Sequence, residues 1–222
     1  MLTAALPAAR APLAAYGTAL RRAASGADTD LTLVDPSGRR APIRLAPGMW
    51  CGPLHRGDAG ILDRCHGATL DVGCGPGRLT AALTRRRITA VGIDISPEAV
   101  RQARRRGADA RIACVFTSRL APARWRHILL ADGNIGIGGD PDRLLARCRT
   151  LLTAGGDIIV ELAPPASTSW AGPVALGFDG SLSTPFAWAT VAADDLPALA
   201  RAAGMHAAET WTEAGRWFAR IA

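Results

Sequence analysis

The chain has 222 residues, of which 49% are hydrophobic and 20% are charged. This composition is typical of one globular domain with a sizeable core and excludes an intrinsically disordered chain. The formal net charge is +7, and every basic residue is arginine. Two dense arginine runs, 85–87 and 104–106, fall at the predicted C-terminal ends of helices, where cations complement the helix dipole. The charge is therefore weak support for nucleic-acid binding.

Membrane insertion, secretion and metal binding are not predicted. No apolar run is long enough to span a bilayer, and prolines and an arginine interrupt the alanine-rich beginning, so we expect a cytoplasmic protein without a signal peptide. The five cysteines are scattered, which favours reduced thiols. No common zinc pattern fits the spacing of Cys51, His55, Cys65 and His66.

The first third of the chain predicts a helix, a hairpin and a loop. Leu13, Tyr16 and Leu20 lie at helical spacing and predict an amphipathic helix over 12–24. A turn sequence at 35–38 separates two short apolar runs, which predicts a hairpin of strands 31–34 and 41–45. A loop over 49–58 then leads to a short helix over 59–65, which we expect Asp58 to cap.

A glycine-rich loop follows the next predicted strand. The strand ends in Asp71-Val72, and Gly73, Gly75 and Gly77 alternate before a helical pattern starts at Leu79. This order predicts a strand, a tight turn and a helix, in which the glycines permit positive φ angles and let the backbone approach a ligand closely. The free N–H groups of the helix's first turn face the same ligand.

Two acids and an arginine indicate which ligand this loop binds. Asp94 ends the next buried strand, where an acid in a doubly wound fold accepts hydrogen bonds from ribose hydroxyls. Asp71 would repel a pyrophosphate but suits an ammonium group, and Arg78 stands where a dinucleotide fingerprint has a glycine. These features favour S-adenosylmethionine, which has a ribose, an amino group and a sulfonium but no phosphate.

The segment 71–77, together with Asp94, resembles the first two motifs of the class I (Rossmann-like) S-adenosylmethionine-dependent methyltransferases of small bacterial type. The resemblance extends over residues 68–163. It implies an α/β fold with a doubly wound, mostly parallel seven-stranded sheet and a C-terminal antiparallel hairpin. It also divides the chain into an N-terminal helix, hairpin and active-site cover (1–66) and a cofactor-binding core (67–222).

The remaining predicted elements follow that fold. Ser96 and Asp140 are expected to cap the helices that follow them, and the glycines of 133–139 are expected to let a loop pass close to the ligands. We expect an irregular, pocket-shaping segment over 163–185. The other predicted elements are strands at 110–116, 125–130, 157–162 and 188–191, helices at 97–106, 144–152 and 194–203, and a closing hairpin of 205–212 and 216–221.

The resemblance implies a set of cofactor-binding residues. They are Asp71, Gly73, Cys74, Gly75, Gly77, Asp94, Ile95, Val115, Phe116, Asp132, Gly133 and Asn134. Related enzymes commonly end the third strand with an acid that meets the adenine, but this chain has Cys114 there. We therefore expect apolar contact with the adenine by Val115 or Phe116, although Phe116 equally suits plain core packing.

Methyl transfer is an in-line displacement at an activated carbon, so the enzyme mainly aligns the acceptor. A base is needed only where the acceptor arrives protonated, and the candidate catalytic residues are Asp132 and His55. Asp132 equally suits the cofactor's amino group, and His127 is expected to be structural. The candidate acceptor-binding residues are Trp50, His55, Arg56, Glu161 and Trp170.

The leading hypothesis is methyl transfer from S-adenosylmethionine to a small-molecule acceptor, with a natural-product role suggested by the family resemblance. Three alternatives stay open: an RNA or protein acceptor, a binding protein that has lost catalysis, and a nicotinamide oxidoreductase, which Asp71 and Arg78 disfavour. We expect neither a nucleic-acid nor a membrane partner, and the protein is expected to be a monomer or a homodimer.

Overall fold

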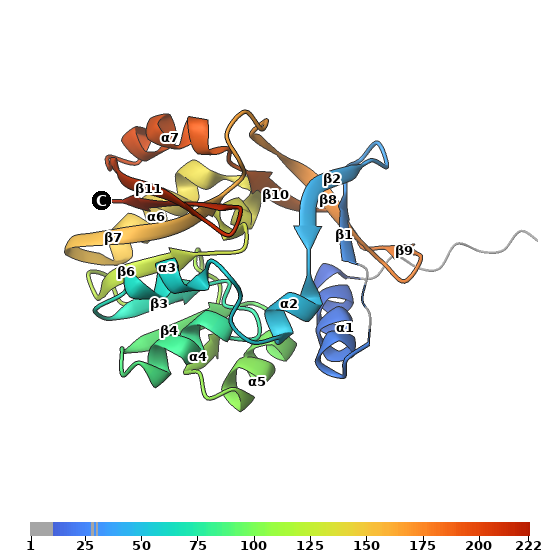
Figure 1. Ribbon diagram of the computed structural model, residues 1–222. Helices are drawn as coiled ribbons and strands as arrows, with labels where there is room; N and C mark the ends of the chain where they lie inside the picture. Colours follow the sequence, from blue (N-terminus) through green and yellow to red (C-terminus); the bar gives the residue numbers. More distant parts are fainter. Residues whose placement is uncertain (1–10, 28, 30) are drawn as a thin grey trace, which may run out of the picture.

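The computed structural model describes residues 11–27, 29 and 31–222. A seven-stranded sheet in the order β11-β12-β7-β6-β3-β4-β5 forms the centre of the molecule (Figure 1). Its strands from β7 to β5 are parallel, and β12 pairs antiparallel with both β7 and β11. The predicted doubly wound α/β fold with a closing antiparallel hairpin is therefore confirmed. The strands are β3 (Thr69–Val72), β4 (Ala90–Asp94), β5 (Ala110–Ile112), β6 (Trp125–Leu130), β7 (Leu152–Leu162), β11 (Ala207–Glu213) and β12 (Arg216–Ile221).

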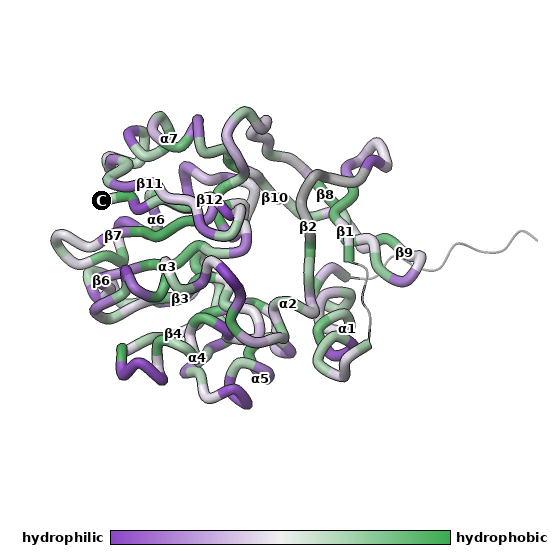
Figure 2. The backbone as a smooth tube through the Cα atoms, in the orientation of Figure 1, coloured by the Kyte–Doolittle hydropathy of each residue, from purple (hydrophilic) through white to green (hydrophobic). Residues whose placement is uncertain are grey.

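Helices cover both faces of this sheet because alternate residues of its strands point to opposite sides. On one face, Ile128 and Leu130 share a buried cluster with residues of α6 and α7. On the other face, Leu129 and Ala131 pack with α3 and α4. Hydrophobic residues run along β6 and β7, whereas hydrophilic stretches lie at the outer ends of α4 and α5 (Figure 2). The helices are α3 (Asp58–Asp63), α4 (Arg78–Arg85), α5 (Pro97–Arg105), α6 (Pro141–Leu151) and α7 (Leu196–Ala202).

A second sheet in the order β10-β8-β1-β2, with β9 paired to β8, lies beside the core (Figure 1). The predicted N-terminal hairpin is β1 and β2, and β1 also pairs antiparallel with β8. The predicted first helix is α1, whose buried Ala15 and Ala19 pack against this sheet. These elements are α1 (Pro12–Ala24), β1 (Leu31–Val34), β2 (Arg40–Leu45), α2 (Pro47–Cys51), β8 (Trp170–Phe178), β9 (Ser181–Leu182) and β10 (Phe186–Thr190).

The expectation of irregular structure over 163–185 is wrong, because this segment contains β8 and β9. Gly172, Pro173 and Gly177 give β8 the composition of a loop. The strand forms because β1 and β10 supply hydrogen-bonding partners on its two sides. β1 lies more than a hundred residues away along the chain, so no local sequence pattern predicts the pairing of β8 with β1.

Several local expectations are corrected. The strand expected at 110–116 ends at Ile112, and 133–139 forms a kinked 3-10 helix, η1 (Asn134–Gly139), rather than a loop. Strand β7 begins at Leu152, five residues before the expected start, because Leu152 pairs with Trp125 of β6. A short 3-10 helix, η2 (Ala193–Asp195), precedes α7, where one helix over 194–203 was expected.

The helix termini follow the predicted chemistry in two places and depart from it in a third. Ser96 accepts a hydrogen bond from the Ala99 N–H, and Asp140 accepts one from the Arg143 N–H, so both predicted caps are confirmed. Asp58 is the first residue of α3 and not its cap. No helix in the described part of the chain is long and apolar enough to cross a membrane.

Candidate functional site

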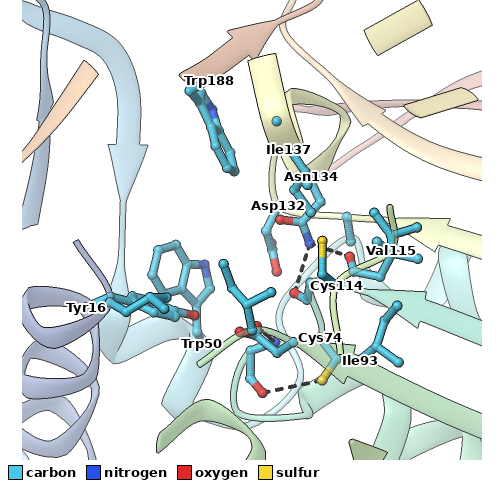
Figure 3. A pocket seen from close by; sticks show the side chains of 18 of the residues that line it. Tyr16, Trp50, Cys74, Ile93, Cys114, Val115, Asp132, Asn134, Ile137 and Trp188 are labelled. Atoms are coloured by element: carbon cyan, nitrogen blue, oxygen red, sulfur yellow. Dashed lines mark hydrogen bonds between the residues drawn. The ribbon is translucent and has the colours of Figure 1, made fainter. Parts of the chain in front are cut away.

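A cavity of about 480 Å³ opens at the carboxyl ends of β3, β4 and β6, where the parallel sheet faces the second sheet (Figure 3). Its floor is the glycine loop between β3 and α4. Its other walls come from α1, α2, β1, β2, η1, β8, β10 and the segment 113–116. In open α/β sheets this edge is where ligands bind, because the strand order reverses there and leaves a crevice.

Asp94 holds the glycine loop in place. Its two carboxylate oxygens accept hydrogen bonds from the Gly75 N–H at 3.0 Å and the Ser96 N–H at 2.7 Å. Gly73 and Gly75 have φ angles of 72° and 53°, which only glycine adopts without strain. Burial raises the pKa of Asp94 above its ordinary value. The carboxylate is therefore rigidly aimed at the edge of the cavity.

Asp71 is a nearly buried carboxylate at the floor of the cavity. It is 2% exposed, and it accepts a hydrogen bond of 2.6 Å from the Thr80 hydroxyl of α4. Burial raises its pKa to about 6, because no cation in the described chain pairs directly with it. A ligand with an ammonium group would supply the missing charge.

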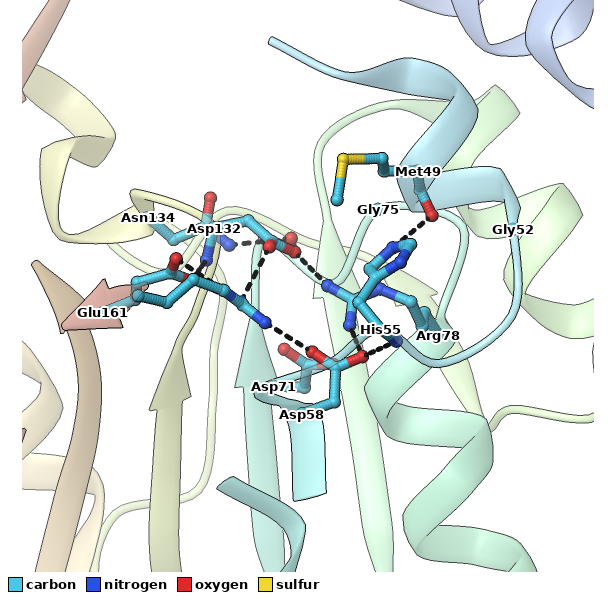
Figure 4. A network of polar contacts seen from close by, with 12 residues as sticks. Met49, Gly52, His55, Asp58, Asp71, Gly75, Arg78, Asp132, Asn134 and Glu161 are labelled. Carbon is cyan, nitrogen blue, oxygen red and sulfur yellow. Dashed lines mark hydrogen bonds and ion pairs between the residues drawn. The ribbon is translucent and has the colours of Figure 1, made fainter. Parts of the chain in front are cut away.

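Five charged side chains form a network beside the cavity (Figure 4). Arg78, which is 4% exposed, donates to the fully buried Asp58 and, at 2.7 Å, to Asp132. Arg216 donates to Asp58 at 2.8 Å, to Glu161 at 2.7 Å and to Asp132 at 3.2 Å. Glu161 also accepts the backbone N–H of Asp132 at 2.7 Å.

This network explains why the predicted capping role of Asp58 is wrong. The Asp58 carboxylate faces the two arginines and accepts the His55 N–H at 2.7 Å, so it is not directed at the first turn of α3. Burial acts to raise the pKa of Asp58, but the hydrogen bonds from Arg78 and Arg216 outweigh it and hold the pKa below its ordinary value. The ion pairs therefore join α3, α4 and β12 at the base of the site.

Asp132 stands between the network and the cavity. Its backbone has a φ angle of 53°, and the side chain lies between Cys74 and Trp188 in Figure 3. Burial raises the pKa of Asp132, while Arg78 and Arg216 act against that rise. The two arginines fix the orientation of a carboxylate that faces the ligand space.

The Asn134 side chain stabilises the glycine loop between β3 and α4. Its side-chain amide donates to the carbonyl oxygens of Val72 and Gly73, each at 2.9 Å. Both amide hydrogens are used in this way, so the side chain braces the turn and leaves only its oxygen for a ligand.

The structure brings most of the predicted cofactor and acceptor residues to one cavity. The predicted residues that line it are Trp50, Asp71, Gly73, Cys74, Gly75, Asp94, Ile95, Val115, Phe116, Asp132 and Asn134. Those outside the lining are His55, Arg56, Gly77, Gly133, Glu161 and Trp170.

The predicted residues outside the lining have other contacts. The His55 ring bonds to the Met49 carbonyl at 2.7 Å, and Glu161 reaches the cavity only through Asp132 and Arg216. Trp170 lines a separate depression with Pro141 and Thr190.

Sequence reasoning identified Trp50 and Phe116 but not the other aromatic side chains of the cavity wall, and it did not identify the roles of Arg78 and Arg216. Tyr16 from α1 and Trp50 from α2 meet edge to face with ring centroids 6.0 Å apart. Phe186 and Trp188 of β10 also line the space, 6.3 Å apart. A basic residue among the apolar residues of the helix after the glycine loop is the signal that could have identified Arg78, whereas no local signal marks the residues of β10.

No group of three or more His, Cys, Asp or Glu side chains within the described ranges is arranged to hold a metal ion.

Comparison with known proteins identifies the fold. Residues 69–156 match the family model described as methyltransferase domain. Among solved structures, a methyltransferase from Bacteroides fragilis, dependent on S-adenosylmethionine and in complex with S-adenosylhomocysteine, matches with a TM-score of 0.74 and 24% identity, covering 98% of this chain and 96% of that chain. No curated protein sequence matches the chain.

Two further structures share the core. The 1,6-didemethyltoxoflavin-N1-methyltransferase of Burkholderia thailandensis matches with a TM-score of 0.50 and 20% identity, over 69% of this chain and 70% of that chain. The sugar N-methyltransferase KedS8 of Streptoalloteichus sp ATCC 53650 matches with a TM-score of 0.51 and 17% identity, over 73% and 83%. The resemblance read from the glycine loop is confirmed: residues 69–156 match the methyltransferase domain model, and the chain has the fold of the solved methyltransferases.

Proposed function

We propose that this protein transfers the methyl group of S-adenosylmethionine to a small-molecule acceptor. The observation that carries the proposal is a single cavity with two kinds of wall. Its floor has carboxylates and a glycine loop at the edge of the parallel sheet, and its opposite side is apolar and aromatic. One ligand with an amino group and a ribose suits the floor, and a second, apolar ligand suits the other side.

The floor residues fit the cofactor in three respects. Asp71 is a buried carboxylate without a direct cationic partner in the described chain, which an α-ammonium group would satisfy. Asp94 is fixed by two loop N–H groups beside the cavity, where its remaining lone pairs suit ribose hydroxyls. Ile95 lines the cavity and is 52% exposed, which offers an apolar surface to a base.

When bound, the cofactor supplies a methyl carbon activated by a sulfonium. The chain's own contribution is alignment of the two ligands, which can supply as much as ~7–11 kcal/mol of the barrier. Asp132 is the residue to which we assign proton acceptance from the acceptor, because its carboxylate lines the cavity and Arg78 and Arg216 hold it in a fixed orientation. His55, whose ring lies outside the lining, is no longer proposed for catalysis.

The named activities of two structural neighbours support a small acceptor. One acts on 1,6-didemethyltoxoflavin and the other on a sugar. The apolar side of the cavity is also poorly suited to an RNA backbone, which requires cationic contacts.

Native mass spectrometry tests the proposal. The purified protein is mixed with S-adenosylmethionine or S-adenosylhomocysteine, and a one-to-one adduct is expected. Asp94→Ala should lose the adduct, because the substitution removes both the loop brace and the carboxylate beside the ligand. Asp63→Ala is the matched control, because Asp63 lies in an exposed ion pair with Arg86. Absence of an adduct with the folded wild-type protein would refute the proposal.

A further inference from the structure

The same cavity has an apolar, aromatic side that borders the cofactor residues, and we call this side the acceptor compartment. Six residues define this acceptor compartment: Tyr16, Trp50, Ile137, Leu176, Phe186 and Trp188. They come from α1, α2, η1, β8 and β10, so the N-terminal elements and the second sheet build it together. Figure 3 shows Tyr16 and Trp50 side by side, and Trp188 pointing toward the same space from another side.

The charged side chains of the described lining lie at the floor of the cavity. The charged residues among the described lining are Asp71, Arg78, Asp94 and Asp132, and all four lie at the carboxyl edge of the parallel sheet or at the start of α4. The acceptor compartment itself has only apolar and aromatic side chains. A charged group placed there would lose its hydration without gaining a partner, which is strongly unfavourable.

The aromatic side chains also define a shape. Tyr16 meets Trp50 edge to face at an interplanar angle of 69°, and Phe186 meets Trp188 at 76°. Rings fixed in this way present flat faces and edges to a ligand, and other aromatic rings pack well against such surfaces.

Polar atoms in the compartment are few. The Trp188 indole N–H is buried without a hydrogen-bond partner among the described residues, and the Tyr16 hydroxyl and the Trp50 indole N–H make no hydrogen bond to a described residue either. Burial, with Asp94 acting in the same direction, raises the pKa of Tyr16 well above its ordinary value, so its hydroxyl stays protonated and available as a donor.

We infer that the methyl acceptor is a flat, uncharged aromatic molecule with a hydrogen-bond acceptor on its edge, bound between the two pairs of aromatic side chains. This inference rests on the proposed function and specifies the class of its acceptor. An anionic acceptor is disfavoured because none of the six residues is cationic, and Arg78, the cation of the described lining, is already paired with Asp58 and Asp132. A cationic acceptor is disfavoured because it would lie beside the positive sulfonium of the bound cofactor.

Isothermal titration calorimetry on the protein saturated with S-adenosylhomocysteine tests the inference. The two probes are isoquinoline, a flat molecule that is neutral at pH 7.5, and 2-naphthoate, an anion of similar shape. Isoquinoline is expected to bind at least tenfold more tightly than 2-naphthoate. This comparison is made on the unaltered protein and does not depend on the folding of a variant.

Three tryptophan variants locate the binding. Trp50→Ala and Trp188→Ala should each weaken isoquinoline binding by about tenfold, the effect of losing one aromatic anchor, and should change S-adenosylhomocysteine binding less than threefold. Trp211→Ala is the matched control, because Trp211 is also a partly buried tryptophan but lies on β11, in a different buried cluster and outside the cavity. It should change neither affinity.

The outcomes separate the inference from the proposed function. Failure of S-adenosylhomocysteine to bind the folded wild-type protein overturns the proposed function, and the inference with it. Binding of S-adenosylhomocysteine with equal or tighter binding of 2-naphthoate overturns the inference alone. The inference alone is also overturned if isoquinoline does not bind, or if its binding is unchanged in both Trp50→Ala and Trp188→Ala.

Discussion

The pH dependence of cofactor binding depends on Asp71. This carboxyl is 2% exposed, and burial raises its pKa to about 6. At pH 5, one unit below that value, roughly one carboxyl in eleven is ionised, whereas at pH 7 roughly nine in ten are. Because only the ionised form pairs with an ammonium group, lowering the pH from 7 to 5 should weaken S-adenosylhomocysteine binding about tenfold, or about 1.4 kcal/mol.

The same shift has a defined effect on stability. The pKa of Asp71 in the folded protein lies above its ordinary value of 3.8. Between pH 3.8 and about pH 6, the folded state therefore binds more protons than the unfolded state. Asp71 therefore favours folding on the acidic side of this window and opposes it as the pH rises through 6. A bound ammonium group offsets that opposition above pH 6, which is why affinity should rise with pH.

Isothermal titration calorimetry of S-adenosylhomocysteine at half-unit steps from pH 5 to pH 7 measures the effect. Asp71→Asn should bind weakly and lose most of the slope. Asp109→Asn, which alters an exposed acid paired with Arg111, should keep both the affinity and the slope of the wild type. The reasoning is refuted if wild-type affinity is constant over this range, or if Asp71→Asn retains the full slope.

Two predictions concern stability, and urea unfolding measures both. Arg78→Met removes the guanidinium from a buried ion network and should destabilise the fold by about 3–5 kcal/mol, whereas Arg86→Met at the surface should cost no more than about 1 kcal/mol. Equal effects would show that the network contributes no more than a surface pair. Gly77→Ala should destabilise by about 1–3 kcal/mol more than Gly107→Ala. Both glycines have positive φ, but a Cβ at Gly77 would lie 2.6 Å from the Cβ of Ala103, whereas Gly107 faces open space. Similar losses of stability in the two variants would show that contact with Ala103 does not make Gly77 the more sensitive position.

The features that the sequence determined by itself lie close together along the chain. The strand, glycine turn and helix around Gly73–Gly77 depend on φ angles and on hydrogen bonds within one turn of structure. Ser96 and Asp140 cap helices through N–H groups three residues away. Asp94 is brought to Gly75 by the parallel pairing of consecutive strands, which the fold class itself requires. For these reasons the fold and the floor of the cavity could be predicted.

Only the tertiary structure decided the rest of the site. Asp58 and Arg216 are separated by 158 positions along the chain and meet in one ion pair, and the loop-like composition of β8 becomes a strand once β1 lies beside it. Tyr16 and Trp188 line one cavity from opposite parts of the sequence. Their side chains are ordinary for a helix and a strand, and their joint role arises from packing between distant elements. Local backbone preferences extend over only a few residues, so they determine single elements and turns but not which distant side chains meet.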